Sequence, residues 1–209
     1  MNQCLRSCTL AASTLFAASL ALVGAQVGTT AGAAAADAAT PPGFSLTRTG
    51  SVHDFDFAAG AWTSRQQRLK ARNVGSTAWE ESPGNIHCAS NFMDGVTTVD
   101  AAYSPAKRPA GLWLHIFDVA KRQWSVYWIN PKTGRMDSGV VGGFDGVRGE
   151  FFGADEDNGK PVRVRYTWEA ADHDHYTWTQ AFSFDNRTWE TNWKSDFTRA
   201  DPAVCATKS

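Results

Sequence analysis

The stretch VRVRYTW at residues 162–168 decides the fold class of this chain. Its apolar residues, two valines, a tyrosine and a tryptophan, alternate strictly with arginine and threonine. A period of two places the apolar set on one face of an extended chain, which is typical of a half-buried β-strand. The stretch from Tyr176 to Ser183 alternates in the same way and predicts a second strand.

Turn-forming pairs such as Asp94-Gly95 and Asn158-Gly159 divide the rest of the domain into similar short stretches. Between these pairs no stretch keeps a helical period. We therefore predict about ten strands, at Ala61–Arg72, His87–Met93, Val96–Tyr103, Gly111–Asp118, Gln123–Asn130, Gly139–Phe144, Gly149–Ala154, Pro161–Trp168, Tyr176–Ser183 and Trp189–Arg199.

Consecutive antiparallel strands with short connections predict an all-β, up-and-down barrel. Closing the sheet removes its edges and leaves room for one small ligand inside. A β-sandwich is the alternative, but sandwiches usually need a longer Greek-key crossing, and the short connections here favour the barrel.

The domain organisation follows from composition. Residues 1–25 combine Arg6, the apolar segment 9–23 and small residues at its end, as a secretory signal peptide does. Residues 26–51 are rich in Ala, Gly and Thr and predict a linker. We expect the barrel at 52–200 and a tail at 201–209. The chain is then periplasmic or secreted, with no stable membrane insertion after cleavage, because the apolar segment is shorter than the roughly 20 residues of a membrane span.

The cysteines leave one question open. Cleavage of the signal peptide would remove Cys4 and Cys8 and leave Cys88 and Cys205 in a compartment that permits disulfides. The two could pair and join the tail to an early strand. Alternatively, Cys88 is an inert buried thiol in an apolar strand.

Gly60-Ala61-Trp62 resembles the Gly-x-Trp motif that opens the first strand of lipocalins and other calycins. That superfamily often places an arginine over this tryptophan, and Arg199 ends the last predicted strand. More broadly, the segments 54–62, 124–128 and 189–199 look like a bacterial lipocalin-like family catalogued as domain of unknown function 1579. The resemblance implies a calycin barrel with Gly60, Trp62 and Arg199 as structural residues, and it implies no reaction.

The 9 tryptophans exceed the ordinary need of one small core. We predict that several line a pocket for a flat apolar or aromatic ligand, with core packing or an exposed strip for stacking sugars as alternatives. The predicted set is Trp113, Trp124, Trp128, Trp168 and Trp178.

Strict alternation from Trp62 would also turn Gln66 and Arg68 inward, as further ligand-binding residues. An inward Arg68 needs a counter-charge, which Glu80, Asp100 or a ligand carboxylate could supply. If a bulge shifts the phase of the strand, Arg68 would face solvent instead.

A catalytic set is a weaker hypothesis. Arg68 could stabilise an anion, His115 could act as acid or base, and Tyr127 could donate a proton. Parity places Tyr127 opposite Trp124 and Trp128, so the three converge only if that tryptophan pair faces outward or a bulge intervenes.

The run Asp172-His173-Asp174-His175 puts two histidines on one side of the chain, as a metal site needs. A charged hairpin turn explains the run equally well, and spacing identifies no third ligand. We expect no metal site and no cofactor.

The function classes narrow by exclusion. A formal charge of -1 without a basic run disfavours nucleic acid as a partner. Nucleophile-elbow, phosphate-loop, dinucleotide and zinc-protease motifs are absent from the sequence. The leading hypothesis is an exported barrel that binds a small, largely apolar or aromatic molecule. The alternatives are a cavity isomerase, cyclase or lyase, and a structural or interaction module.

Overall fold

The computed structural model describes residues 44–206. The predicted signal peptide, the first part of the predicted linker and the last three residues of the tail lie outside the described residues. The elements are η1 (Asp56–Ala58), β1 (Gly60–Leu69), β2 (Trp79–Ser82), β3 (Ile86–Phe92), β4 (Thr97–Tyr103), β5 (Pro109–Asp118), β6 (Gln123–Asn130), β7 (Arg135–Met136), β8 (Val140–Asp145), β9 (Arg148–Asp157), β10 (Lys160–Ala170), β11 (His175–Ser183), β12 (Glu190–Arg199) and η2 (Pro202–Cys205).

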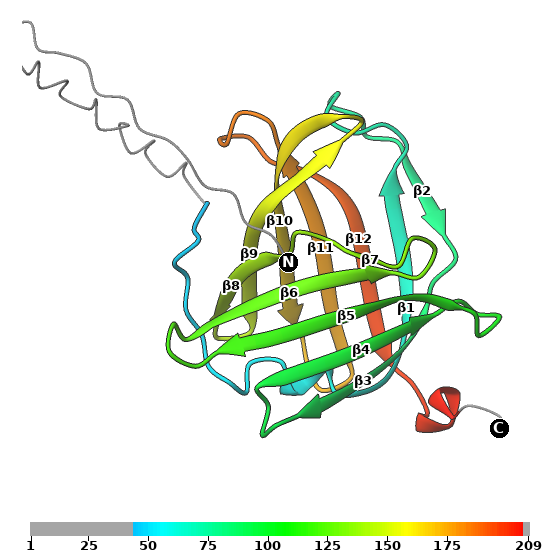
Figure 1. The fold of residues 1–209 in the computed structure, drawn as a ribbon. Helices are drawn as coiled ribbons and strands as arrows, with labels where there is room; N and C mark the ends of the chain where they lie inside the picture. The colour runs from blue at the N-terminus through cyan, green and yellow to red at the C-terminus, as the bar shows by residue number, and fades with distance from the viewer. Residues whose placement is uncertain (1–43, 207–209) are drawn as a thin grey trace, which may run out of the picture. The chain divides into compact units, whose positions relative to one another are not determined.

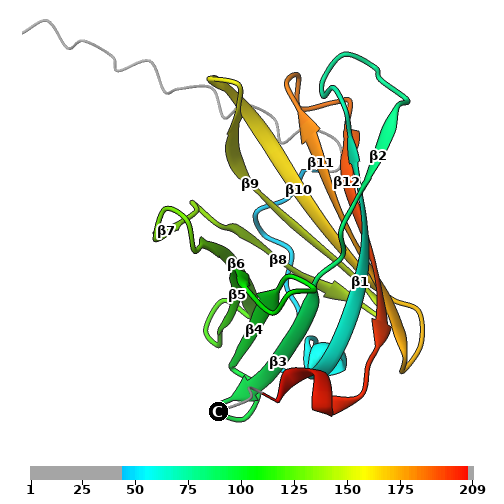
Figure 2. The same ribbon diagram turned by 90° about the vertical axis from the view of Figure 1, so that its right-hand side faces the viewer.

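The strands form a closed antiparallel barrel of ten strands (Figure 1). Going round the barrel, the order is β1, β3, β4, β5, β6, β8, β9, β10, β11 and β12, and β12 pairs back with β1. The short β2 and β7 pair with β1 and β6. Figure 2 shows β3 to β6 as one wall of the barrel, with β1 and β10 to β12 on the other side. The barrel prediction is confirmed, and the β-sandwich is excluded because β12 closes on β1.

The strand β2 is not among the predicted strands. Pro83, Gly84 and Asn85 form the bend that connects it to β3, and β2 and β3 pair with successive parts of β1. The Ser64 N–H donates to the Asn85 carbonyl at 2.9 Å, and the Asn85 N–H donates to Ser64 Oγ at 3.0 Å. A Cβ on Gly84 would lie 1.5 Å from the Ser64 carbonyl oxygen, so only glycine fits this close approach.

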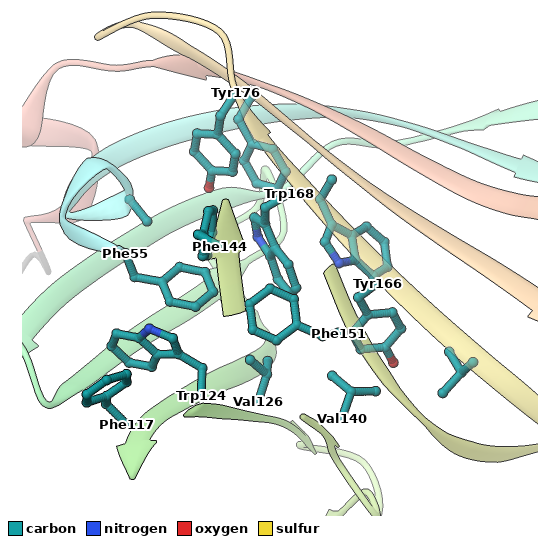
Figure 3. Packing of buried hydrophobic residues seen from close by; sticks show 14 of the residues in the cluster. Phe55, Phe117, Trp124, Val126, Val140, Phe144, Phe151, Tyr166, Trp168 and Tyr176 are labelled. Atoms are coloured by element: carbon teal, nitrogen blue, oxygen red, sulfur yellow. The ribbon is translucent and has the colours of Figure 1, made fainter. Parts of the chain in front are cut away.

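A plug of aromatic side chains fills one end of the barrel. Phe55, just before η1, is 1% exposed, and its ring contacts Trp124, Phe144, Phe151 and Trp168 at centroid distances of 4.9, 5.0, 5.7 and 5.5 Å. Figure 3 shows the Phe55 ring pointing into this cluster from the segment that precedes β1. The segment that carries Phe55, just before β1, therefore covers the closed end of the barrel.

Residues 44–51 lie along the outside of the barrel. The Phe44 ring packs on Phe152 at 5.2 Å, and Arg48 pairs with Glu150 at 2.5 Å. The Gln123 side-chain amide donates to the carbonyls of residues 46 and 48. These eight residues therefore belong to the barrel domain and not to a linker, which corrects the predicted boundary. The composition of the segment concealed this because most of its bonds are made by its backbone.

The tail returns to the barrel wall. Cys205 in η2 forms a disulfide with Cys88 in β3, so the pairing that the sequence left open is formed. Among the described residues, no helix is long and apolar enough to cross a membrane.

Candidate ligand-binding site

The three predicted structural residues meet at the closed end. The Arg199 guanidinium lies over the Trp62 ring at 4.0 Å and donates to the carbonyls of Phe57, Ala59 and His173. Gly60 has a φ of 117°, and a Cβ there would approach Arg199 Nη1 to 2.9 Å. Arg199 thus ties η1 and the β10–β11 turn to the barrel, as a structural residue does.

Between the plug and the opposite end lies a cavity of about 670 Å³. Exposed lining residues lie in the bend at 83–85, the β4–β5 loop and the β6–β7 loop, and these segments therefore border its opening. Six of the seven predicted ligand-binding residues line it: Gln66, Arg68, Trp113, Trp128, Trp168 and Trp178. The sequence did not identify Trp193, Tyr176 and Phe197 as lining residues, although their positions follow the same alternation.

Trp124 is the exception among the predicted tryptophans. It faces inward as its strand parity requires, but it is fully buried in the plug, where it contacts Phe55 and Phe117. Its Nε1 donates to the Ser51 carbonyl at 3.0 Å. The prediction that Trp124 binds ligand is therefore wrong, because the residue lies below the cavity.

Tryptophans make up one continuous part of the cavity wall. The ring of Trp113 lies 4.7 Å from that of Trp128 and 5.7 Å from that of Trp178, and Trp178 lies 5.1 Å from Trp193. Trp113 and Trp128 come from the neighbouring strands β5 and β6, and Trp178 and Trp193 come from β11 and β12. The contact between Trp113 and Trp178 therefore joins two walls of the barrel. Such a wall presents flat apolar surfaces to a flat apolar ligand.

Buried polar side chains also line the cavity, among them His87, Asp100 and His115. His87 Nδ1 and Asp100 Oδ2 are 2.8 Å apart, and both side chains are buried. His115 is 3% exposed and its ring stacks on Phe55 at 4.3 Å. Burial lowers the pKa of His115 to about 4, and the nearby negative charge of Asp100 opposes that shift only in part. His115 is therefore a neutral imidazole near neutral pH.

The predicted catalytic set does not assemble. Trp124 and Val126 face inward, which turns the intervening strand positions outward, and Tyr127 packs outside the cavity against Gly139. Arg68 and His115 do line the cavity. The hypothesis that Arg68, His115 and Tyr127 share one site is wrong, because β6 has neither the bulge nor the opposite phase that it required.

Residues 172–175, which the sequence offered as metal ligands, form a hairpin turn between β10 and β11. His173 Nδ1 lies 2.7 Å from Asp174 Oδ1, and His175 Nδ1 lies 3.0 Å from Asp172 Oδ1, with all four side chains exposed. Each histidine is paired with its own neighbour. Within residues 44–206 no group of three or more metal-ligating side chains comes together.

The buried His115 predicts a loss of stability on the acid side. An unfolded histidine has a pKa of about 6.5. The unfolded chain therefore binds a proton that the folded chain, with its pKa of about 4, does not. As pH falls from about 6.5 to about 4, this difference should remove about 3 kcal/mol from the free energy of unfolding.

Urea unfolding at several pH values within that window measures this effect. His115→Leu should flatten the pH dependence, whereas the control His173→Gln, at an exposed hairpin position, should leave it unchanged. An equally steep pH dependence in His115→Leu would show that another group is responsible.

No family model matches the chain, and no curated protein matches it. The candidate site therefore rests on its own geometry.

Proposed function

We propose that the chain is an exported, lipocalin-like protein that binds a small, largely apolar or aromatic molecule inside its barrel. One observation carries the proposal: the cavity of about 670 Å³ with five tryptophans in its lining. Sites for drug-sized molecules usually measure roughly 300 to 1,000 Å³ and are mostly apolar with a few polar groups. The cavity has this size, and its lining joins a group of apolar aromatic rings to a comparable number of polar side chains.

Two further observations support the proposal. The contact between Trp62 and Arg199 is what the resemblance to calycins implies, and it supports a place in the bacterial lipocalin-like family. The disulfide between Cys88 and Cys205 supports export, because disulfides persist in oxidising compartments. Since Tyr127 lies outside the cavity, binding is a better account of the site than isomerase, cyclase or lyase chemistry.

Titration of the intrinsic tryptophan fluorescence tests the proposal. Fatty acids, isoprenoids, aromatic polyketides and haem form a suitable panel, and we expect at least one of them to cause a saturable change. A panel with no effect on the fluorescence would contradict binding of these classes.

A variant that fills the cavity locates the binding. Ser195 is 3% exposed, lines the cavity and lies between Gln66 and Trp178 in the sheet. Ser195→Phe would place a ring in the space that a ligand uses, and we expect it to lower affinity about tenfold or more. Thr63→Phe, on the outer face of β1, adds the same ring outside the barrel and should leave affinity unchanged. If folded Ser195→Phe, checked by circular dichroism, binds as tightly as the unmodified chain, the ligand does not enter this cavity.

A further inference from the structure

Three basic side chains line the cavity, and each comes from a different part of the chain. Arg68 lies on β1, Arg108 is in the loop before β5, and Lys132 is in the loop between β6 and β7. All three are exposed, so they lie towards the opening and not in the buried interior. One acidic residue, Asp100, occurs among the described lining residues, and it is bonded to His87 inside the barrel. The lining therefore carries an excess of positive charge at its opening.

Arg68 has the most defined geometry of the three. Its guanidinium carbon lies 3.5 Å from the centroid of the Trp193 ring. A guanidinium stacked on a ring keeps its N–H donors at its edge, where a planar anion can accept two of them. The stacking thus joins an apolar surface and an anion-binding edge in one place.

No acidic side chain among residues 44–206 forms an ion pair with any of these three cations. Glu80 is the cross-strand neighbour of Arg68, yet the two do not come within ion-pair distance. Partial burial of the guanidinium, and then the neighbouring Arg72, lowers the pKa of Arg68, as expected for a cation without a close counter-charge. By contrast, Arg72 pairs with Asp157 and Arg148 pairs with Glu150 and Glu169. Arg72 and Arg148 therefore have the acidic partners that Arg68 lacks, although Arg163 and Arg165 on β10 also form no ion pair within residues 44–206.

We propose that the cavity selects molecules that combine a flat apolar body with one anionic group, which Arg68, Arg108 and Lys132 hold at the mouth. The apolar body lies against the tryptophan rings of the cavity wall, and a carboxylate or sulfonate stays close to the solvent, where its desolvation costs least. This inference rests on the proposed function and names the chemical class of its ligand. In this arrangement the anionic group of the ligand supplies the counter-charge of Arg68.

Two fluorescent probes with the same apolar body isolate the contribution of charge. Anilinonaphthalenesulfonate carries a sulfonate, and phenylnaphthylamine is its uncharged parent. Both are titrated into the full chain at low and at moderate salt. Raising the ionic strength from about 0.01 M to about 0.1 M shortens the screening length from about 30 Å to about 10 Å. We expect this change to weaken binding of the sulfonate and to leave binding of the uncharged probe nearly unchanged.

Matched variants locate the charge. The double variant Arg108→Gln with Lys132→Gln should lower affinity for the sulfonate about five- to tenfold at low salt, and Arg68→Gln should lower it about tenfold. Affinity for the uncharged probe should stay within about twofold in both. Arg187→Gln with Lys160→Gln is the control. It removes the same two kinds of charge from exposed positions outside the cavity lining, and it should change neither affinity.

The outcomes separate this inference from the proposed function. If both probes bind and Ser195→Phe blocks both, but the charge variants leave their affinity ratio unchanged, the cavity binds ligands without selecting anions and the inference is wrong. If the control pair lowers sulfonate affinity as much as the mouth pair, net charge and not the mouth is responsible, and the inference is again wrong. If neither probe binds and the wider panel also fails, the proposed function fails and this inference fails with it.

Discussion

Phe55→Ala is expected to lower the free energy of unfolding by about 3 to 5 kcal/mol, the usual cost of truncating a buried phenylalanine. The Phe55 ring is 1% exposed and stacks on His115, and it contacts Phe144, Phe151 and Trp168 from a segment that belongs to no strand. Its loss would leave a void at the closed end that the rigid strands around it cannot easily fill. The expected cost therefore lies in the upper part of the range for core truncations.

Urea unfolding followed by far-ultraviolet circular dichroism gives the free energy of Phe55→Ala. Phe184→Ala is the matched control, because Phe184 is 50% exposed in the loop after β11 and should cost no more than about 0.5 kcal/mol. A loss below about 1 kcal/mol in Phe55→Ala would show that the plug contributes little to the stability of the barrel.

The strands could be predicted because most of them have a buried face towards the barrel interior and an opposite face exposed to solvent. The alternation from Val162 to Trp168 matches β10 because those inward residues are buried while Arg163 is exposed. The prediction failed for segments whose structure depends on backbone hydrogen bonds and not on a pattern of side chains. The four-residue strand β2 was missed, and residues 44–51 resemble a linker because their bonds to the barrel are mostly made by backbone atoms.

The sequence predicts which side chains of the candidate site point into the barrel, but not how far along the barrel axis each one lies. Trp124 and Trp128 are four residues apart on β6 and both face inward, as their equal parity requires. Only Trp128 reaches the cavity, because Trp124 lies one level lower, in the plug. Position along the barrel axis depends on the stagger between strands, which the pattern of one strand does not contain.

The other incorrect or missing site residues also depend on strand register or on loop conformation, which a single-strand pattern does not contain. Tyr127 and His115 could have shared a face only through a change of phase, and the register pairs His115 with Val126 instead. Arg108 and Lys132 lie in loops, where side-chain direction follows no period, so no pattern marked them as lining residues. His87 and Asp100 come from neighbouring strands and meet diagonally, and this contact also depends on register.

Removal of the disulfide should lower the free energy of unfolding as much as Phe55→Ala does. The cause is different, because the disulfide limits the conformational entropy of the unfolded chain. Cys88 and Cys205 are 117 positions apart, and the loop-entropy model assigns a loop of that length about 5 kcal/mol, at the upper end of the measured range. The folded tail itself contributes little, because η2 has no buried residue. We therefore expect Cys88→Ser with Cys205→Ser to lower the free energy of unfolding by about 3 to 5 kcal/mol.

The denaturant slope distinguishes this mechanism from a loss of native contacts. An unfolded chain without the crosslink expands and exposes more surface, so the double serine variant should show a steeper dependence of the free energy on urea concentration. A reducing agent should make the unmodified chain behave like the variant and should leave the variant unchanged, which controls for Cys4 and Cys8. Val204→Ser alters the same short helix and keeps the disulfide, so its slope should equal that of the unmodified chain. If the double variant loses stability with no change in slope, the disulfide acts on the folded barrel and the loop-entropy account is wrong.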